Sequence, residues 1–370
     1  MHIPDGYLSP QTCAAFTVVM LPAWYQAGRQ VQTVVKTRYV PLVAVGAAFS
    51  FLVMMFNVPI PDGTTAHAVG AGLIAVLLGP WAACVAVSIA LLIQALFFGD
   101  GGILAFPANA FNMALVMPFV AYGCYRLLAH RTALTSPRRV VAAAVGGYAG
   151  LNAAALCAAI EFGLQPELFH RADGTPLYAP FHLDQTIPAM LLAHLTVAGA
   201  IEAAVTGGVV GYLQRANLPL LRINAPDVPR TPADAARRGV SPGRAGLVAI
   251  AVMAGLTPLG LLAPGGAFGE DTPANLDLGR YGLTAVPTGL QKYSGFWGDA
   301  LLPGYGNGTA WQYLLSAVIG VAVVGLLVGG LTAALHRVRG GGGPADTADT
   351  ANTANTANGT GPTNATAARA

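Results

Sequence analysis

Long apolar runs separated by short polar segments dominate this chain. The runs predict membrane spans over 12–28, 39–57, 68–98, 107–127, 140–162, 187–213, 245–264 and 312–335. Each is long enough to cross a bilayer as a helix, which needs about 20 residues. The run 68–98 is too long for one span, and Gly79 followed by Pro80 interrupts it. Because proline disfavours helix at the residue before it, we split this run into 67–78 and 80–98, which predicts nine transmembrane helices.

The basic residues orient these helices. They cluster in four segments, at 29–38, at 126–139, at 215–244 and after 335. With nine spans all four clusters fall on one side, which the positive-inside rule makes the inner side. The N-terminus is then outside and the C-terminus inside. Acidic residues such as Asp5, Asp100 and Glu270 collect on the outer side, which attracts cations without specifying one.

The spans divide the chain into four parts. Residues 1–222 are predicted to form a seven-helix bundle, and residues 223–243 a Pro- and Arg-rich cytoplasmic linker. Residues 244–339 follow as a two-helix hairpin with a long outer loop. Residues 340–370 form a low-complexity polar tail that cannot bury enough apolar surface to fold. The predicted fold class is therefore an all-α, multi-pass integral membrane protein.

Composition narrows the function classes. Charged residues make up 9% of the chain and hydrophobic residues 54%, far from the roughly 25% charged average of soluble domains. The net charge of +3 is small and spread over separate loops, which argues against nucleic-acid binding. The chain has no P-loop, HExxH or GxSxG motif, so we expect no catalytic residue, and ATP hydrolysis must reside on other subunits if it drives transport.

The first two residues offer a way to bind a metal. The α-amine of Met1, the backbone nitrogen of His2 and its imidazole can close fused chelate rings on one ion, because an α-amine titrates near neutral pH. An all-nitrogen planar set suits Ni(II) or Cu(II), and Co(II) lies just below nickel in affinity. His67, at the start of the 67–78 helix, is a candidate fourth nitrogen. The alternatives are that His2 is an incidental terminal residue and that His67 is structural.

Other polar residues lie within the spans, and we single out Asn109, Asn112, His194 and Glu202. They are candidates to line the interior or to fix a loop over a metal, since polar groups inside membranes are often functional. Hydrogen bonding between helices is the alternative interpretation.

Four blocks in order along residues 1–215 resemble the CbiM/NikM substrate-binding (S) components of cobalt and nickel energy-coupling-factor (ECF) transporters. The blocks are MHIPDGYLSP, NVPIPDGTTAHAVGAGLIAVLLGPWAA, LLIQALFFGDGGILAFPANAFNM and AHLTVAGAIEAAVTGGVVGYL. The region from Ala267 onward resembles the fused PDGLE-type extension related to CbiN/NikN. Here the motif reads PTGLQ over residues 287–291, and the loss of both acidic residues favours a positioning or gating role over metal ligation.

The resemblance implies a metal site and partners. The metal would be held by the terminal amine of Met1, the backbone and side chain of His2, and His67. Asn109 and Asn112 would support the ligands, whereas no metal-binding role is implied for the pattern that contains His194 and Glu202. The implied setting is the multi-pass (inner) cell membrane of a bacterium or archaeon. The implied partners are a membrane T component (CbiQ/NikQ-like) and cytosolic ABC ATPases (CbiO/NikO-like). The transported substrate would be Co²⁺ or Ni²⁺, which the residues do not separate, and there is no cofactor.

Two other function classes are weaker. A self-sufficient secondary metal permease would need ionisable residues along its whole path, and only His194 and Glu202 lie deep in the spans. No constellation of residues supports a membrane enzyme of corrinoid synthesis.

Overall fold

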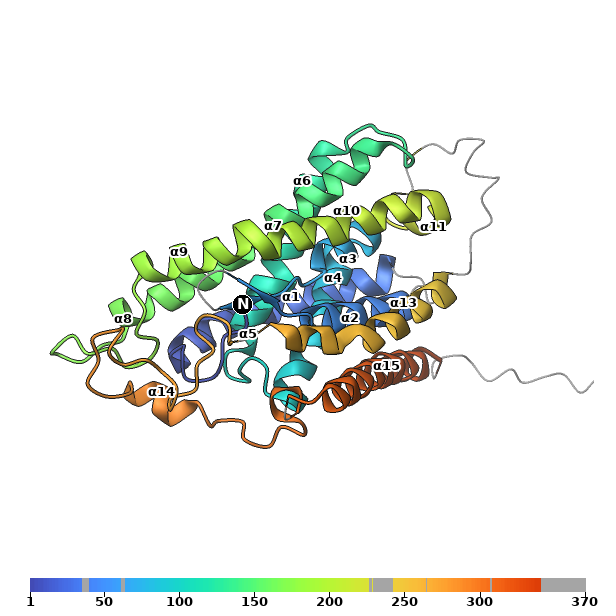
Figure 1. Cartoon of the computed structure of the whole chain (residues 1–370). Coiled ribbons are helices and arrows are strands. Elements are labelled where there is room, and N and C mark those ends of the chain that lie inside the picture. Colours follow the sequence, from blue (N-terminus) through green and yellow to red (C-terminus); the bar gives the residue numbers. More distant parts are fainter. Residues whose placement is uncertain are drawn as a thin grey trace, which may run out of the picture. The chain divides into compact units, whose positions relative to one another are not determined.

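The computed structural model describes residues 1–34, 40–60, 64–225, 228, 242–263, 265–306 and 308–340. Most of these residues are helical (Figure 1). The longer helices are α1 (Pro10–Val34), α2 (Val40–Met54), α3 (Ala71–Leu78), α4 (Pro80–Ile93), α6 (Met117–Leu128), α7 (Pro137–Gly163), α9 (Leu183–Ala193), α10 (Gly199–Ala216), α13 (Pro242–Leu256) and α15 (Ala310–Gly340). The short helices are α5 (Phe106–Ala110), α8 (Gln165–Leu168), α11 (Leu218–Leu221) and α14 (Thr288–Tyr293). One antiparallel pair, β1 (Val58–Pro59) and β2 (Thr65–Ala66), departs from the all-α prediction.

Several helices are long and apolar enough to cross a membrane. Among the described residues six satisfy both criteria: 80–98, 106–128, 137–168, 183–216, 244–262 and 310–330. Residues 41–54 form a shorter apolar helix. The chain is therefore a multi-pass membrane protein, while the count of nine spans and the orientation of the termini stay predictions.

Residues 1–332 form one compact unit, and the end of α15, from residue 333 to residue 340, belongs to a second. Most of the predicted linker over 223–243, and the tail from residue 341, lie outside the described residues. The sites described below belong to the first unit.

The predicted break at Gly79 and Pro80 is confirmed. Gly79 adopts a φ of 92°, which favours glycine, and α4 starts with Pro80 in its first turn, where the missing N–H costs nothing. The last turn of α3 leaves carbonyl groups unpaired within the helix. The side-chain amide of Asn224 donates to the carbonyls of Ala75 and Val76 at 3.2 Å each, and the Ala75 carbonyl also accepts the N–H of Gly79 at 2.9 Å. Asn224, which follows α10 in the sequence, therefore hydrogen-bonds to the end of α3 at this break.

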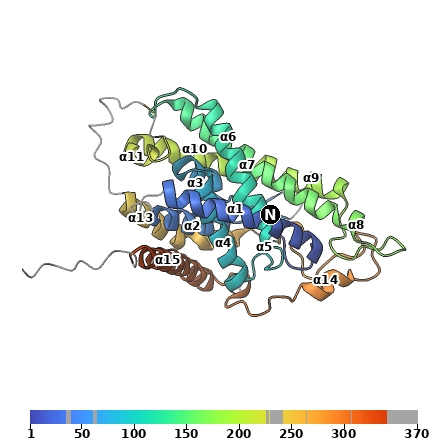
Figure 2. The same ribbon diagram turned by 180° about the vertical axis from the view of Figure 1, so that it is seen from behind.

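Small residues let α7 approach its neighbours closely. A Cβ at Gly146 would lie 2.5 Å from the carbonyl oxygen of Ala121, and one at Gly150 would lie 2.6 Å from that of Met117. Glycine is therefore required where α7 crosses α6, as is common between membrane helices. The run α9–α10 packs along α7, and the two lie side by side in both views (Figures 1 and 2).

Three π-helical segments interrupt the regular helices: η2 (Gln94–Phe98), η3 (Phe111–Val116) and η4 (His194–Ala198). Each contains a buried polar residue, namely Gln94, Asn112 and His194 respectively. Such single-turn bulges occur frequently at functional sites, because they turn a side chain away from the regular helical register.

Candidate metal site

The N-terminal segment runs through the interior of the first unit. Met1, His2 and Ile3 are buried, with exposed fractions of 4%, 2% and 0%. Figures 1 and 2 both place the N-terminus beside α1 and α5. The first three residues of the chain are therefore part of its buried core.

His2 and His67 meet there. The Nε2 atom of His67 lies 3.3 Å from Nδ1 of His2, and the ring centroids are 5.0 Å apart. The Nδ1 atom of His67 lies 3.0 Å from the carbonyl oxygen of Ala68. That oxygen can only accept, so Nδ1 of His67 carries the proton and Nε2 presents a lone pair to His2. A backbone carbonyl on one ring nitrogen is the usual way to orient a metal-binding histidine.

His67 does not begin a helix, which corrects the predicted start at residue 67. It follows β2, in which Ala66 pairs with Val58 of β1, and α3 begins only at Ala71. The short strand pair turns the backbone before the helix starts. His67 is therefore presented from an extended segment and not from the side of α3.

Glu202 of α10 holds this extended segment. Its Oε2 atom accepts the backbone N–H groups of Val69 and Gly70, each at 2.9 Å. Gly70 has a φ of 75°, and a Cβ at that position would overlap the ring of Phe49. A buried carboxylate needs such donors because water is excluded from it. Glu202 thus fixes the backbone two and three residues after His67.

The backbone that follows His2 is fixed by Asn109. Its Oδ1 atom accepts the N–H of Ile3 at 2.8 Å, and its Nδ2 atom donates to the Ile3 carbonyl at 3.0 Å. This two-sided pairing satisfies both polar groups of a fully buried residue, as burial requires.

Asp5 adds a second anchor to the N-terminal segment. Its carboxylate accepts backbone N–H groups at 3.0, 2.8 and 3.1 Å, which belong to Ile103, Leu104 and Ala105. Burial raises the pKa of Asp5 above its ordinary value, and the three N–H groups oppose this effect. Gly102, which directly precedes these three residues, has no room for a side chain, because a Cβ there would overlap the Asp5 carboxylate.

Acidic and phenolic groups also lie beside His2. Asp100 places Oδ1 3.4 Å from Nδ1 of His2. Its Oδ2 atom accepts a hydrogen bond from the hydroxyl of Tyr305, and Gln94 donates to that same hydroxyl at 2.9 Å. Burial lowers the pKa of His2 below its ordinary value, and the nearby Asp100 carboxylate opposes this shift. The imidazole is therefore a neutral donor of electron pairs at neutral pH.

Glu270 approaches the first residue of the chain. Its Oε1 atom lies 3.8 Å from the α-amine of Met1. Loss of solvation raises the pKa of Glu270, and the α-amine opposes the shift. Glu270 and Tyr305 both come from the segment between α13 and α15, so the C-terminal part of the chain contributes to this cluster.

The cluster opens onto a cavity of about 480 Å³ lined by His2, His67, Asp100, Glu270 and Tyr305. Nε2 of His67 and Oδ1 of Asp100, both bearing electron pairs, converge on Nδ1 of His2, an arrangement that favours a proton or a cation between them. No group of three or more His, Cys, Asp or Glu side chains in the described part of the chain has the geometry to hold a metal. A metal bound by His2 and His67 would therefore need backbone nitrogens as well.

The other two predicted polar residues differ in position. His194 lies close enough to the Met1 amine and to His67 to interact electrostatically with both. Its Nδ1 atom donates to the Met190 carbonyl at 2.7 Å, and its Nε2 atom is buried without a described partner. Asn112 is not brought to the cluster, because its amide donates to Glu161 of α7 at 2.9 Å.

Sequence reasoning missed the roles of Asp100, Tyr305 and Glu270. The acidic character of the loops that we predict to be outer is visible in the sequence, but nothing local to these positions indicates contact with His2 or Met1. In the PTGLQ motif, Thr288 and Gln291 are exposed, whereas Gly289 and Leu290 are buried. A Cβ at Gly6 would lie 2.8 Å from the carbonyl oxygen of Leu290, so this motif packs directly on the N-terminal segment.

Comparison with known proteins places the chain in a family. The model of the CbiM family, described as the cobalt uptake substrate-specific transmembrane region, matches residues 2–220. The fused nickel transport protein NikMN of Rhodobacter capsulatus is 48% identical over 351 residues, covering 91% of this chain and 98% of that protein. The probable fused nickel transport protein LarMN of Lactiplantibacillus plantarum is 46% identical over 339 residues, covering 90% and 97%.

A solved structure agrees with these relatives. The crystal structure of a truncated transition metal transporter is 58% identical, with a TM-score of 0.54, and covers 58% of this chain and 98% of that one. The family match spans more than half of the chain, and the fused relatives extend over its C-terminal part as well. This chain therefore belongs to the CbiM family of membrane proteins for metal uptake, with a fused C-terminal extension.

Proposed function

We propose that this chain is the metal-binding S component of an ATP-driven ECF transporter, and that it captures a divalent ion through its N-terminal nitrogens. The ligands are the α-amine of Met1, the backbone nitrogen and Nδ1 of His2, and Nε2 of His67. The observation that carries the proposal is the 3.3 Å approach of the two imidazole nitrogens in a buried cluster. Adjacent corners of a square-planar nitrogen set lie about 2.8 Å apart when metal–nitrogen bonds are about 2 Å long, so the two nitrogens need to approach by only about 0.5 Å more to become neighbouring ligands.

We infer that the ion is Ni²⁺ in preference to Co²⁺. A square-planar all-nitrogen set suits Ni(II). The two fused relatives are named as nickel transport proteins, while the family description names cobalt uptake. Competition between the two ions in equilibrium binding tests this preference, and tighter binding of Co²⁺ would overturn it.

The proposed setting follows from the charge pattern of the chain. The N-terminus is outside, residues 1–222 form the metal-binding bundle, and residues 244–339 form the hairpin whose loop covers the cluster. A CbiQ/NikQ-like T component and CbiO/NikO-like ATPases would supply the driving force. Copurification of the tagged chain with these subunits tests the assembly.

The main experiment is equilibrium binding of Ni²⁺ to the purified full chain. His2→Ala and His67→Ala each remove one nitrogen ligand, and we expect at least a hundredfold loss of affinity. His170→Ala is the matched control, because His170 is exposed on the loop after α8. Undiminished binding by both cluster variants would overturn the site.

A second experiment addresses the α-amine. One glycine inserted before Met1 moves the amine away from the cluster while every side chain is retained. We expect binding to be lost, and an equal insertion at the C-terminal end to leave it unchanged. Retained affinity after the N-terminal insertion would exclude the chelate.

A self-sufficient permease is disfavoured by the way its buried carboxylates are engaged. Glu202 holds backbone N–H groups, and Glu161 accepts from Asn112. Glu202 is therefore committed to backbone groups, and the one remaining Glu161 oxygen, Oε1, does not make a path of exchangeable ligands. Ni²⁺ uptake by proteoliposomes that contain this chain alone would reverse this conclusion.

A further inference from the structure

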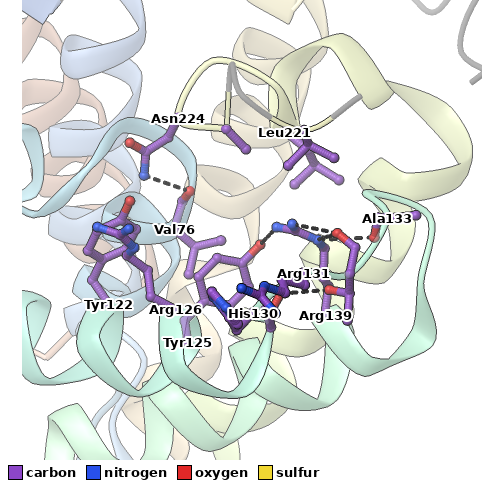
Figure 3. A pocket seen from close by; sticks show the side chains of 14 residues that line it. Val76, Tyr122, Tyr125, Arg126, His130, Arg131, Ala133, Arg139, Leu221 and Asn224 are labelled. Carbon is purple, nitrogen blue, oxygen red and sulfur yellow. Dashed lines mark hydrogen bonds between the residues drawn. The ribbon is translucent and has the colours of Figure 1, made fainter. Parts of the chain in front are cut away.

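A second, larger cavity lies at the other end of α3 from His67. It has a volume of about 720 Å³, and its walls come from the loop between α6 and α7, the end of α3 and the region of α11. Figure 3 shows Asn224 and Leu221 on one side of the opening and His130 and Arg131 on the other. Nothing in the proposed metal function uses this cavity.

The cavity is strongly basic. Arg126, Arg131, Arg139 and His130 line it, and no Asp or Glu is among its lining residues in the described part of the chain. None of these arginines forms an ion pair with a carboxylate among the described residues. Three permanent positive charges therefore share one concave surface without a described counter-ion.

The loop between α6 and α7, which carries His130 and Arg131, is held in place. Arg139 is 6% exposed and donates to the hydroxyl of Tyr125 and the carbonyl of Thr132 at 2.7 and 2.8 Å. Gln214 of α10 donates to the Leu134 carbonyl at 2.7 Å. The charge of Arg139 is met by neutral dipoles only, which leaves a buried cation that favours an anion nearby.

Arg131 adds an independent indication. Its backbone φ is 53°, in the left-handed region that non-glycine residues rarely adopt. Such strain is found where the surrounding structure imposes it, often at ligand sites. This conformation keeps Arg131 on the cavity wall opposite Leu221 (Figure 3).

The surroundings match the boundary of a membrane. The cavity lies where the spans 106–128 and 137–168 end and begin, and Leu127, beside Arg126, is 76% exposed. Tyr122 and Tyr125 form part of the wall, and tyrosines are enriched at the level of lipid headgroups. Apolar side chains from Val76 and Leu221 complete it. A ligand with both a phosphate and an apolar part fits these walls better than a free anion.

We propose that this cavity binds the phosphate headgroup of an anionic membrane phospholipid. Arg126 and Arg131 contact the phosphate at the opening, and Arg139 stabilises its charge from below. Basic pockets between membrane helices are a general form of headgroup site. The exposed side chain of Leu127 lies where the acyl chains would run along the bundle.

The test measures retained lipid by native mass spectrometry of the full chain, titrated with phosphatidylglycerol or with phosphatidylcholine. We expect preferential, saturable binding of phosphatidylglycerol. The double variant Arg126→Gln/Arg131→Gln should weaken that binding about tenfold or more, since each basic residue contributes about fivefold to anionic-lipid binding. Arg138→Gln is the matched control, because Arg138 is an exposed arginine of the same region that does not line the cavity.

Ni²⁺ binding by the double variant separates this proposal from the proposed function, since neither arginine belongs to the metal cluster. Unchanged Ni²⁺ affinity with weakened lipid binding supports the headgroup site. Equal phosphatidylglycerol binding by wild type and double variant overturns it. Inorganic phosphate that binds the lipid-free protein as tightly as phosphatidylglycerol would make the site one for a free anion. If the double variant no longer copurifies with its partner subunits but binds lipid as the wild type does, the cavity is a site for an acidic protein segment. Either result overturns the proposal.

Discussion

Asn109 and Ile3 form a two-sided pair in which one side-chain amide satisfies both backbone polar groups of a buried residue. Asn109 lies on α5, and Ile3 directly follows His2. The pair therefore sets the direction in which the backbone nitrogen and imidazole of His2 point. The pair matters for metal binding because Ile3 lies one residue after His2, a proposed ligand.

Replacing Asn109 with alanine should weaken Ni²⁺ binding about tenfold, because it leaves the buried N–H of Ile3 unpaired, at a cost of about 1–3 kcal/mol, while the Ile3 carbonyl still accepts from Gly102. Isothermal titration calorimetry measures the loss. Asn152→Ala is the control, since the amide of Asn152 donates only within α7, to the Tyr148 carbonyl. Equal losses in both variants would show that the effect is general destabilisation.

Gly102→Ala should disturb the same segment by steric overlap. A Cβ at residue 102 would collide with the carboxylate and backbone of Asp5, and overpacking of this kind costs about 1–3 kcal/mol. We expect a lower melting temperature and weaker Ni²⁺ binding. Gly298→Ala, where a Cβ would meet nothing within 4 Å, should change neither. A Gly102→Ala protein with wild-type affinity would mean that Asp5 does not fix the N-terminal segment.

Tyr305→Phe removes one hydroxyl that connects the C-terminal extension to the cluster. Burial holds the pKa of Tyr305 well above its ordinary value, so the phenol stays protonated and donates to Asp100. Without it only the 3.4 Å hydrogen bond from Gln94 holds the Asp100 carboxylate near His2, and we expect roughly tenfold weaker Ni²⁺ binding, the lower range for residues that orient ligands. Tyr293→Phe is the control, because that ring stacks on Tyr178. If Tyr305→Phe leaves Ni²⁺ binding unchanged, Asp100 does not contribute to the metal site.

Acid should destabilise the metal-free protein through His2. Its pKa in the folded protein lies below the ordinary value of 6.5 because of burial. Below pH 6.5 the unfolded chain therefore binds a proton that the folded chain does not, so stability is fully present above this pH and is lost as the pH falls.

Thermal unfolding at pH 7.5 and 5.5 measures this dependence. His2→Asn should reduce the drop in melting temperature by about 2–4 °C, the shift expected for about 1 kcal/mol. His170→Asn should leave the drop as in the wild type. An identical drop in wild type and His2→Asn would contradict the buried, neutral state of His2.

Helix boundaries set by local chemistry were accessible from the sequence. Proline at residue 80 and the glycine before it end α3 and start α4 as predicted. The start of α3 was wrong, because the pairing of Ala66 with Val58 determines it, and a two-residue strand has no periodicity to detect. The meeting of Tyr305 with Asp100 joins residues 205 positions apart. Such contacts depend on how the loop folds back over the bundle, which hydropathy does not encode.

Among the proposed ligands, the approach of His2 to His67 agrees with the arrangement that the resemblance implies. The geometry adds what the motif could not, namely which ring nitrogens face each other and why. Asn112 illustrates the limit of the motif, because it lies only three positions after Asn109, yet its amide, within the π-helical segment η3, donates to Glu161.

The two hydrogen bonds from the backbone of Val69 and Gly70 to Glu202 have a mechanical consequence. Glu202 belongs to α10, which lies in the longest candidate membrane span among the described residues, 183–216. A rotation or tilt of α10 therefore pulls the backbone that presents His67, with one carboxylate as the linkage. Movement of α10 would therefore also change the spacing between the imidazoles of His67 and His2, which couples the position of this helix to the geometry of the cluster.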